Sequence, residues 1–449
     1  MFQKLLIANR GEIAVRIIRA CREMGIKTVA VYSQADADAL HTQLADESIC
    51  IGKAEAKDSY LNMERILSAT IASGADAIHP GFGFLSENSK FAALCEKCNI
   101  AFIGPSARTI EETGNKSEAR NAMVRAGVPV IPGTKEPIFT AEAGRKFADE
   151  IGYPVMIKAA LGGGGKGMRV VQNSTDFEKN FQNAQREAEN GFGDNSMYIE
   201  KYIEHPKHIE FQILADNEGN TIHLGERDCS VQRRHQKMIE ESPCTALDED
   251  LREQMGAMAV RAAKAVGYRN AGTVEFLLDS HRQFYFMEIN TRIQVEHGVT
   301  ELVTGIDLVK EQIRIAAGEK LGLRQSDIHL TGHAMEVRIN AENPDKNFAP
   351  CPGTIQELHI PGGNGVRIDT AVYPGYIIPP YYDSMIMKVM VYDKDRESAL
   401  KKMRSTVGEV SMEVVTTNLD FQYEILKNKE FESGAVHTDF IEKNFEETA

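Results

Sequence analysis

One ten-residue stretch, Glu288–His297, constrains this chain more than any other feature, because its polar side chains recur at every second position. A β-strand turns successive side chains to opposite faces, so we expect the polar residues to share one face above an apolar backing. These polar residues are Glu288, Asn290, Arg292, Gln294 and Glu296. A solvated face on an amphipathic strand is the ordinary interpretation, and the preceding residues argue against it.

Two runs rich in aromatic and β-branched residues precede this stretch and predict a hairpin, with Asp279 closing the first strand and Phe284 opening the second. If Asp279 opposes Phe284, then Glu275 lies directly across from Glu288. Like charges in opposed positions destabilise a sheet. A cation held between the two carboxylates would remove that penalty.

The residue types at this hairpin favour magnesium. Mg²⁺ usually binds one or two carboxylates and completes its shell with water and substrate phosphates. Asn290, two residues beyond Glu288, adds a neutral oxygen to the same predicted face. The sequence therefore predicts a metal site at Glu275, Glu288 and Asn290.

The length, net charge and cysteine content limit the possible domain organisation and class of the protein. A chain of 449 residues has room for three domains at about 150 residues each. The formal net charge of -14 argues against a protein that grips nucleic acid. We find no apolar run near the roughly 20 residues of a membrane span, and the first residues do not resemble a signal peptide. The odd, scattered set of seven cysteines indicates reduced thiols, so we expect a cytoplasmic protein.

The N-terminal region predicts a parallel sheet. A strand at Lys4–Ala8, an amphipathic helix and a strand at Thr28–Val31 form a βαβ unit. Further along, Pro80–Phe84 predicts a loop, and Ser86 is a candidate helix N-cap. The glycines that flank Phe82 suit a simple turn, and they would equally let the aromatic ring face a ligand.

The glycine-rich run 162–167 satisfies GxGxxG, but the match is misleading because a strand follows it instead of a helix. It is not a Walker A motif either, since Gly167 stands where Ser or Thr should be. A floppy surface turn is one interpretation. We favour a hairpin whose backbone N–H groups close over phosphates, because Lys158 supplies a positive charge just before it.

Cations gather in Arg227–Lys237 of this acidic chain, just before the predicted hairpin. A charge run is usually exposed to solvent, and here an anion clamp is the better interpretation. Upstream of it, His208, Glu210 and Gln212 alternate along another predicted strand.

Several long motifs then resemble known families. The Lys158 strand, the glycine hairpin, Glu200-Lys201, and Glu275 with Glu288-x-Asn290 resemble the ATP-grasp fold. The segments His79–Asn88, Arg227–Lys237, Glu288–His297 and Pro380–Met385 closely resemble biotin carboxylase, and the likeness runs from Met1 to about Glu442. The resemblance implies an α/β and α+β architecture: an N-terminal Rossmann-like domain at 1–113, an ATP-grasp domain at 114–331 with a mobile lid at about 131–203, and a C-terminal α+β domain at 332–449.

The resemblance also implies site residues. Those implied to bind ATP are Lys116, Lys158, Gly163, Gly164, Gly165, Glu200, Lys201, Ile203, His208, Gln232, His235, Leu277 and Glu288. Those implied to hold bicarbonate are Lys237, Arg292, Gln294, Val295 and Glu296, while Phe82 and Arg338 match positions near biotin. Its metal ligands fall on Glu275, Glu288 and Asn290, for Mg²⁺ or Mn²⁺ and two ions in all.

In the chemistry that the resemblance implies, Glu296 is the general base for bicarbonate, Lys237 and Arg292 are also catalytic, and Arg338 stabilises the biotin enolate. This sequence departs from the family pattern at Phe82, where many members have tyrosine, at Leu161, where glycine is common, and at Gly298, where proline usually follows His297.

The implied function is the first half-reaction of acetyl-CoA carboxylase, in which biotin on a biotin carboxyl carrier protein is carboxylated through carboxyphosphate. Expected partners are that carrier, carboxyltransferase subunits and a second copy of the chain. One alternative is the corresponding subunit of a split pyruvate carboxylase or another acyl-CoA carboxylase. Another is an inactive nucleotide-binding scaffold, which is disfavoured because Glu296, Lys237 and Arg338 are all present.

Overall fold

The structure, a computed structural model, describes residues 1–159 and 167–445 and consists of two compact units. The first unit contains Met1–Val128, Lys207–Phe276 and Glu288–Ala449, and the second contains Pro129–Pro206 and Leu277–Met287. We describe each unit by itself.

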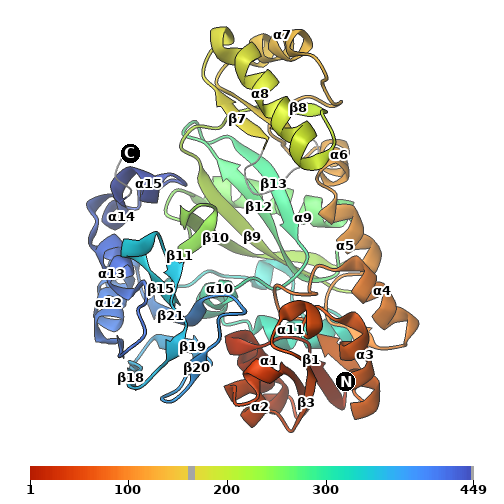
Figure 1. The fold of residues 1–449 in the computed structure, drawn as a ribbon, viewed down its shortest axis with the longest axis vertical. Coiled ribbons are helices and arrows are strands. Elements are labelled where there is room, and N and C mark those ends of the chain that lie inside the picture. The colour runs from red at the N-terminus through yellow and green to blue at the C-terminus, as the bar shows by residue number, and fades with distance from the viewer. Residues whose placement is uncertain (160–166, 446–449) are drawn as a thin grey trace. The chain divides into compact units, whose positions relative to one another are not determined.

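The N-terminal part of the first unit is a parallel five-stranded sheet in the order β3-β2-β1-β4-β5, which confirms the predicted βαβ start (Figure 1). Its strands are β1 (Lys4–Ile7), β2 (Lys27–Ser33), β3 (Glu47–Gly52), β4 (Ala77–His79) and β5 (Ala101–Phe102). The helices in this region are α1 (Gly11–Glu23), α2 (Leu40–Leu44), α3 (Met63–Ser73), α4 (Ser89–Lys97), α5 (Ala107–Gly114) and α6 (Lys116–Ala126).

The N-cap of α4 differs from the prediction. Asn88, and not Ser86, occupies the cap, and its side chain accepts a hydrogen bond of 2.9 Å from the backbone N–H of Phe91. Ser86 is buried two residues earlier, within the turn that precedes the helix. Asparagine and serine are both good N-caps, so composition alone could not choose between them.

The large sheet has eight strands in the order β13-β12-β9-β10-β11-β14-β21-β19. Their bounds are β9 (Lys207–Ala215), β10 (Thr221–Arg233), β11 (Gln236–Ser242), β12 (Asn270–Leu278), β13 (Phe284–Asn290), β14 (His333–Asn340), β19 (Val366–Thr370) and β21 (Met385–Asp393). The short strands are β15 (Glu342–Asn343), β16 (Ala349–Pro350), β17 (Gly353–Thr354), β18 (Leu358–His359), β20 (Ile377–Ile378) and β22 (Ser411–Met412).

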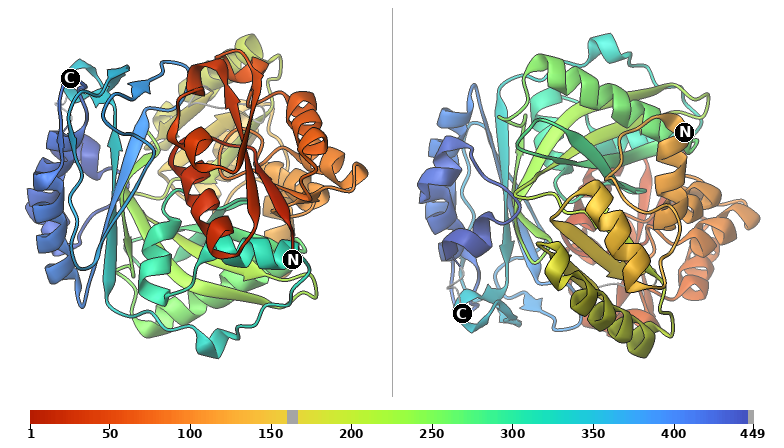
Figure 2. Two further views of the ribbon diagram at one scale, coloured as in Figure 1. Left: turned by 90° about the horizontal axis from the view of Figure 1, so that it is seen from below. Right: turned by 90° about the horizontal axis from the view of Figure 1, so that it is seen from above.

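Helices cover this part of the first unit. They are α9 (Glu249–Ala265), α10 (His297–Thr304), α11 (Leu308–Ala316), α12 (Arg396–Glu409), α13 (Leu419–Lys427), α14 (Lys429–Ser433) and α15 (Phe440–Phe445). Figure 2 shows the C-terminal helices, in blue, as a layer beside β14 and β21. The core between them includes Met335, Val389, Leu400 and Leu426, all buried, so α12 and α13 are held by apolar packing.

The second unit contains a three-stranded antiparallel sheet in the order β7-β6-β8. Its strands are β6 (Val155–Ala159), β7 (Met168–Val171) and β8 (Met197–Lys201), and its helices are α7 (Ala141–Ile151) and α8 (Ser174–Phe192). Phe177 and Phe181 of α8 are fully buried against this sheet. The predicted lid, at about 131–203, lies in the sequence range of this unit.

The predicted ten-residue polar strand is wrong beyond Asn290. Strand β13 ends there, and residues 291–296 lead into α10 without strand structure. The backbone N–H of Thr291 donates to the Glu87 carboxylate at 3.1 Å instead of to a neighbouring strand. Glu296 then occupies the N-cap position of α10.

The predicted hairpin register also needs correction. The backbone N–H of Asp279 donates to the carbonyl of Gln283 at 2.9 Å, so the turn closes one residue earlier than an Asp279–Phe284 pairing would require. The Asp279 carboxylate accepts from the backbone N–H groups of His281 and Gln283, both at 2.8 Å, and Arg282 has a φ of 62°. Side-chain capping of the turn thus selects the tighter closure.

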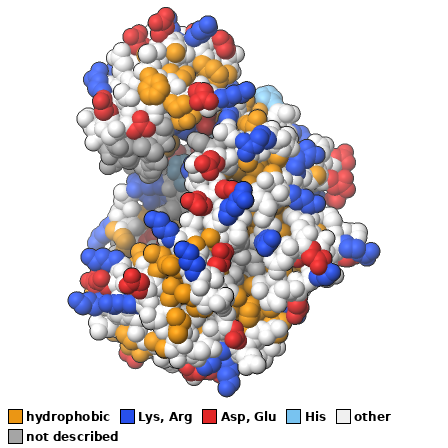
Figure 3. All heavy atoms as spheres, turned by 90° about the vertical axis from the view of Figure 1, so that its right-hand side faces the viewer, with side chains coloured by type: hydrophobic (Ala, Val, Ile, Leu, Met, Phe, Trp, Pro, Cys, Tyr) orange, Lys and Arg blue, Asp and Glu red, His pale blue; other side chains and the backbone are white. Residues whose placement is uncertain are grey.

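Charged side chains are mixed by sign on the face drawn in Figure 3, where lysine and arginine lie among aspartate and glutamate. Across residues 1–159 and 167–445, no helix has both the length and the apolar composition needed to cross a membrane.

Candidate active site

The buried carboxylate of Glu296 is the centre of the site. Its Oε1 accepts a hydrogen bond of 2.6 Å from Lys237 on β11, and its Oε2 accepts one of 2.8 Å from Arg338 on β14. Burial alone would raise the pKa of Glu296, but the charges of Lys237, Arg338 and Arg227 outweigh it and hold the pKa well below its ordinary value. Three residues distant in the sequence therefore form one ionic cluster.

Lys237 joins this cluster to two further carboxylates. Its ammonium lies 2.6 Å from Glu210 Oε2 and 3.2 Å from Glu275 Oε1. Burial would lower the pKa of Lys237, but Cys229 and the surrounding carboxylates raise it well above its ordinary value. Lys237 is therefore a fixed positive charge inside the site.

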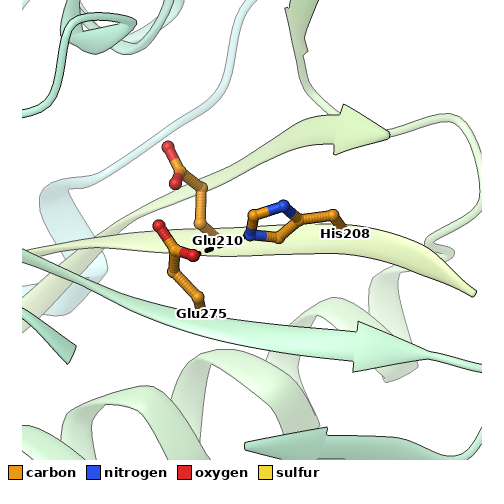
Figure 4. A group of neighbouring side chains, drawn as sticks. All are labelled: His208, Glu210 and Glu275. Atoms are coloured by element: carbon orange, nitrogen blue, oxygen red, sulfur yellow. Dashed lines mark hydrogen bonds and ion pairs between the residues drawn. The ribbon is translucent and has the colours of Figure 1, made fainter. Parts of the chain in front are cut away.

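Strands β9 and β12 supply the next layer. Figure 4 shows the side chains of His208, Glu210 and Glu275 pointing toward one another. The Nε2 of His208 lies 2.8 Å from Glu275 Oε2, and Arg227 lies 2.5 Å from Glu210 Oε1. Because the polar atoms of His208, Glu210 and Glu275 lie within 4.8 Å of one another, this trio is also a candidate metal-binding group.

The predicted metal ligands fit a divalent ion. Asn290 donates to Glu275 Oε1 at 2.7 Å, so their side chains are adjacent. Burial and the negative charge of Glu275 raise the pKa of Glu288, which shows that the two carboxylates repel each other. Glu275 and Glu288 are therefore electrostatic neighbours, and a cation that prefers oxygen ligands would relieve the repulsion between them.

Arg292 is held by side chains from two directions. Its Nε donates to Glu87 Oε2 at 3.0 Å, and its guanidinium donates to Gln294 Oε1 at 2.5 Å. Gln294 in turn donates to Glu275 Oε1 at 3.2 Å. The carbonyl of Val295 accepts from the buried Lys388 at 2.9 Å. The structure thus brings the predicted bicarbonate residues together around Glu275 and Glu296.

Arg338 contacts a second carboxylate besides Glu296. The same guanidinium nitrogen lies 2.5 Å from Glu240 Oε1. Glu240 is fully buried on β11 and pairs across the sheet with Glu336 on β14, which is equally buried. Burial raises the pKa of Glu240, and the positive charge of Arg338 offsets part of that rise.

Other predicted residues of the first unit form none of the hydrogen bonds or ion pairs described above, although the charge of Lys116 acts to lower the pKa of Glu288. Phe82 is half-buried in the loop after β4, and Lys116 is exposed at the start of α6. Gln232 is buried on β10, and His235 is exposed in the turn between β10 and β11 with a φ of 63°.

The second unit carries the remaining predicted ATP residues. Lys158 of β6 forms a hydrogen-bonded ion pair with Glu200 of β8. Lys201 donates to the carbonyls of Gly152 and Tyr153 at 3.0 and 2.9 Å. Ile203 and Leu277 are half-buried. Gly163, Gly164, Gly165 and Leu161 lie outside the described residues.

Three residues of the site were not among the predicted ones. Glu210 carried a signal, because it alternates with His208 on one strand. Glu87 lies within the motif His79–Asn88, but neither it nor Glu240 carried a signal for these contacts, because their partners, Arg292 and Arg338, are far away in the sequence. Only the sheet order and the loop after β4 bring each pair together.

Comparison with known proteins agrees with this geometry. The family models described as "Biotin carboxylase, N-terminal domain", "Carbamoyl-phosphate synthase L chain, ATP binding domain" and "Biotin carboxylase C-terminal domain" match residues 1–110, 115–324 and 336–443. The chain is 58% identical over 443 residues to "Biotin carboxylase 1" of Bacillus subtilis (strain 168), covering 98% of each chain. It is 53% identical to a pyruvate carboxylase subunit of Methanothermobacter thermautotrophicus, covering 99% of this chain and 90% of that one.

A solved structure gives the same result in three dimensions. The biotin carboxylase domain dimer of Hydrogenobacter thermophilus 2-oxoglutarate carboxylase, in complex with MgADP, ADP and bicarbonate, superposes with a TM-score of 0.91 at 50% identity, covering 99% of this chain and 98% of that one. The fold is therefore an ATP-grasp fold with flanking biotin carboxylase domains. The chain belongs to the biotin carboxylase family of ATP-grasp ligases.

Proposed function

We propose that this biotin carboxylase performs the first half-reaction of acetyl-CoA carboxylase, the ATP- and bicarbonate-dependent carboxylation of biotin on a carrier protein. The observation that supports its chemistry is the buried Glu296 carboxylate held between Lys237 and Arg338 at 2.6 and 2.8 Å. A base, a fixed ammonium and a guanidinium meet there, as deprotonation of bicarbonate and stabilisation of a biotin enolate require.

Glu296 acts as the general base toward bicarbonate. Its low pKa comes from the positive charges of Lys237, Arg338 and Arg227. Bicarbonate competes for Lys237, Arg292 and the amide of Gln294, and biotin competes for Arg338. As these partners turn toward the substrates, the pKa of Glu296 rises toward the range in which a carboxylate accepts a proton.

Deprotonated bicarbonate attacks the γ-phosphoryl group of ATP and forms carboxyphosphate, and the bond to the β,γ-bridging oxygen breaks to release ADP. The positive charges of Lys237 and Arg292 offset the negative charge of the reacting anions, which is the main contribution of a protein to phosphoryl transfer. Mg²⁺, bound by Glu275, Glu288 and Asn290, would supply further charge neutralisation at the phosphates. ATP and Mg²⁺ are thus the cofactors, with Lys116, Lys158, Glu200, Lys201, Ile203, His208, Gln232, His235 and Leu277 as proposed nucleotide contacts.

Arg338 serves the biotin step. Carboxyphosphate breaks into CO₂ and phosphate, phosphate removes the N1′ proton of biotin, and the enolate attacks CO₂. The guanidinium donors of Arg338 stabilise the developing enolate oxygen. Phe82 is the proposed neighbour of the biotin ring.

The acyl acceptor is the finer part of the proposal. A subunit of a split pyruvate carboxylase is the second candidate, favoured by the 53% identity to the Methanothermobacter protein. We propose a carrier protein, carboxyltransferase subunits and a second copy of this chain as partners, and a cytoplasmic location. The three proposed domains are 1–113, 114–331 and 332–449.

Two assays test the proposal. The purified chain should cleave ATP only when bicarbonate is present, and free biotin should stimulate the reaction. The chain, purified with its native partners, should then transfer the carboxyl group from carboxybiotin to acetyl-CoA. Transfer to pyruvate instead would select the second candidate, and bicarbonate-independent ATP cleavage would contradict the activity itself.

The role of Arg338 has its own test. Arg338→Ala should reduce carboxylation of free biotin by about two orders of magnitude while bicarbonate-dependent ATP cleavage falls much less. The guanidinium is assigned to the biotin step, so the two activities should separate. An equal loss of both would contradict the assignment.

A further inference from the structure

Arg338 is shared between two buried carboxylates that have different fates in the proposed reaction. Glu296, 2.8 Å away, takes the bicarbonate proton and loses its charge. Glu240, 2.5 Å from the same nitrogen, lies outside the bicarbonate residues and contacts neither Lys237 nor Arg292 among the described residues. When Glu296 is protonated, Glu240 remains as the ionic partner of Arg338.

The contact to Glu240 is ionic without being a directed hydrogen bond. Within the described residues, neither carboxylate oxygen of Glu240 has a hydrogen-bond partner. The Nε of Arg338 has none either. Arg338 can therefore turn its donors toward a substrate oxygen while its charge stays next to Glu240. A bidentate clamp would instead fix the guanidinium plane.

We propose that Glu240 is a positioning residue that holds Arg338 at the biotin site after Glu296 has been protonated. The inference rests on the proposed role of Arg338. It assigns a function to a carboxylate that is fully buried and that the bicarbonate step does not need. An unused buried charge is destabilising, and its pairing with Arg338 offsets that loss.

A double-mutant cycle tests this proposal. Glu240→Gln keeps the shape of the side chain and removes its charge. In this variant the kcat/KM for carboxylation of free biotin should fall about tenfold or more, while bicarbonate-dependent ATP cleavage without biotin stays within about threefold of the parent. Retained ATP cleavage also shows that the variant is folded.

The second arm of the cycle combines the change with Arg338→Ala. If Glu240 acts through Arg338, the double variant should carboxylate biotin no more slowly than Arg338→Ala alone. Additive losses would overturn the proposal, and so would equal loss of both activities in Glu240→Gln. If Arg338→Ala itself loses both activities equally, the proposed role of Arg338 fails first, which is a distinct outcome.

Glu336→Gln is the matched control. Glu336 pairs with Glu240 across β11 and β14 and is equally buried, and its charge acts on the pKa of Arg338. Within 1–159 and 167–445, however, its carboxylate has neither a hydrogen bond nor an ion pair to Arg338. Its removal should not separate the two activities. A selective loss of biotin carboxylation in Glu336→Gln, as large as in Glu240→Gln, would show that general burial of charge and not the contact to Arg338 is responsible.

Discussion

Met390 occupies the space that a side chain at position 298 would need. A Cβ placed on Gly298 would lie 2.2 Å from the Sδ of Met390, which is fully buried on β21. Gly298 is the second residue of α10, directly after His297. Met390 therefore leaves no room at position 298 for the side chain of another residue, which gives Gly298 a packing reason in this chain.

This packing makes a stability prediction. Alanine in place of a helical glycine usually stabilises a protein by about 0.5–1 kcal/mol. Gly298→Ala should instead lower the free energy of unfolding by about 1–3 kcal/mol, because the methyl group overpacks against Met390. Urea unfolding monitored by circular dichroism would measure the change.

Gly408→Ala is the control for this change. Gly408 also lies in a helix, α12, but its added Cβ would be 3.5 Å from the ring of Tyr423, which is ordinary van der Waals contact. That variant should be neutral or more stable. If the two variants were equally stable, Met390 would have moved aside without lowering the free energy of unfolding, and the prediction would be contradicted.

Residue types, together with the family resemblance, predicted which charged residues gather at the site. They did not predict which hydrogen bonds and ion pairs these residues form. Glu275 and Asn290 are adjacent, and Glu296 contacts Lys237, as residue types and motif spacing led us to expect. The low pKa of Glu296 could not be foreseen. It depends on Arg227 and Arg338, which only the three-dimensional arrangement brings close.

At the scale of elements, one asparagine side chain holds the loop between β4 and α4 by hydrogen bonds. The Nδ2 of Asn9, just after β1, donates to the carbonyls of Pro80 and Phe82, both at 2.7 Å. Asn9 is buried, and Gly81 between the two carbonyls has a φ of 60°. The side chain thus sets the path of the loop that carries Phe82.

Asn9→Ala should weaken biotin binding through this loop. Loss of two hydrogen bonds, one buried and one part-buried, of about 1 kcal/mol each should let the loop relax and raise the KM for free biotin about threefold to tenfold. Bicarbonate-dependent ATP cleavage should change little, since Glu296 and Lys237 are untouched. Steady-state kinetics with varied biotin would measure the split.

Asn62→Ala offers a comparison variant, because the Asn62 side chain accepts the N-cap hydrogen bond of α3 from the backbone N–H of Arg65 at 3.0 Å and, among the described residues, forms no hydrogen bond with the loop. It should lower stability without raising the KM for biotin. The loop account would be contradicted if both variants changed the KM alike, or if Asn9→Ala left it unchanged.

Strand ends were the least predictable elements. Alternation continues through Glu296 in the sequence, but β13 stops at Asn290 because Glu87 captures the backbone N–H of Thr291. The hairpin closes early because the Asp279 side chain bonds the turn backbone. Both outcomes depend on side chain to backbone hydrogen bonds, which periodicity does not report.

At the scale of the whole molecule, the order of the strands in the eight-stranded sheet could not be predicted from the sequence. Lys237 and Arg338 meet because β11 and β14 are antiparallel neighbours, although α9, β12, β13, α10 and α11 all lie between these two strands in the sequence. The β-α-β pattern at the N-terminus did predict the parallel sheet there. Local patterns therefore indicated the elements, and long-range pairing placed the site.

Buried histidine makes stability depend on pH. Burial, with the nearby charge of Arg10, lowers the pKa of His41 to about 4. An unfolded histidine has a pKa of about 6.5, so below that pH the unfolded chain binds a proton that the folded chain excludes. The contribution of His41 to stability is therefore complete at high pH and is lost as the pH falls from about 6.5 toward 4.

His41→Gln isolates this contribution. The difference in unfolding free energy between the parent and the variant should shrink by about 2 kcal/mol between pH 7.5 and pH 5. Urea unfolding at both pH values would measure it. His329→Gln, at an exposed position, should show a much smaller change, and an equal change in both variants would contradict the role of burial.

The central claim is that Glu296, between Lys237 and Arg338, is the base that activates bicarbonate. The most direct measurement is bicarbonate-dependent ADP release by Glu296→Gln, together with nucleotide affinity from equilibrium titration. The account predicts that ADP release falls by about three orders of magnitude while nucleotide affinity stays within about threefold of the parent. Near-parental ADP release by the folded variant would contradict it.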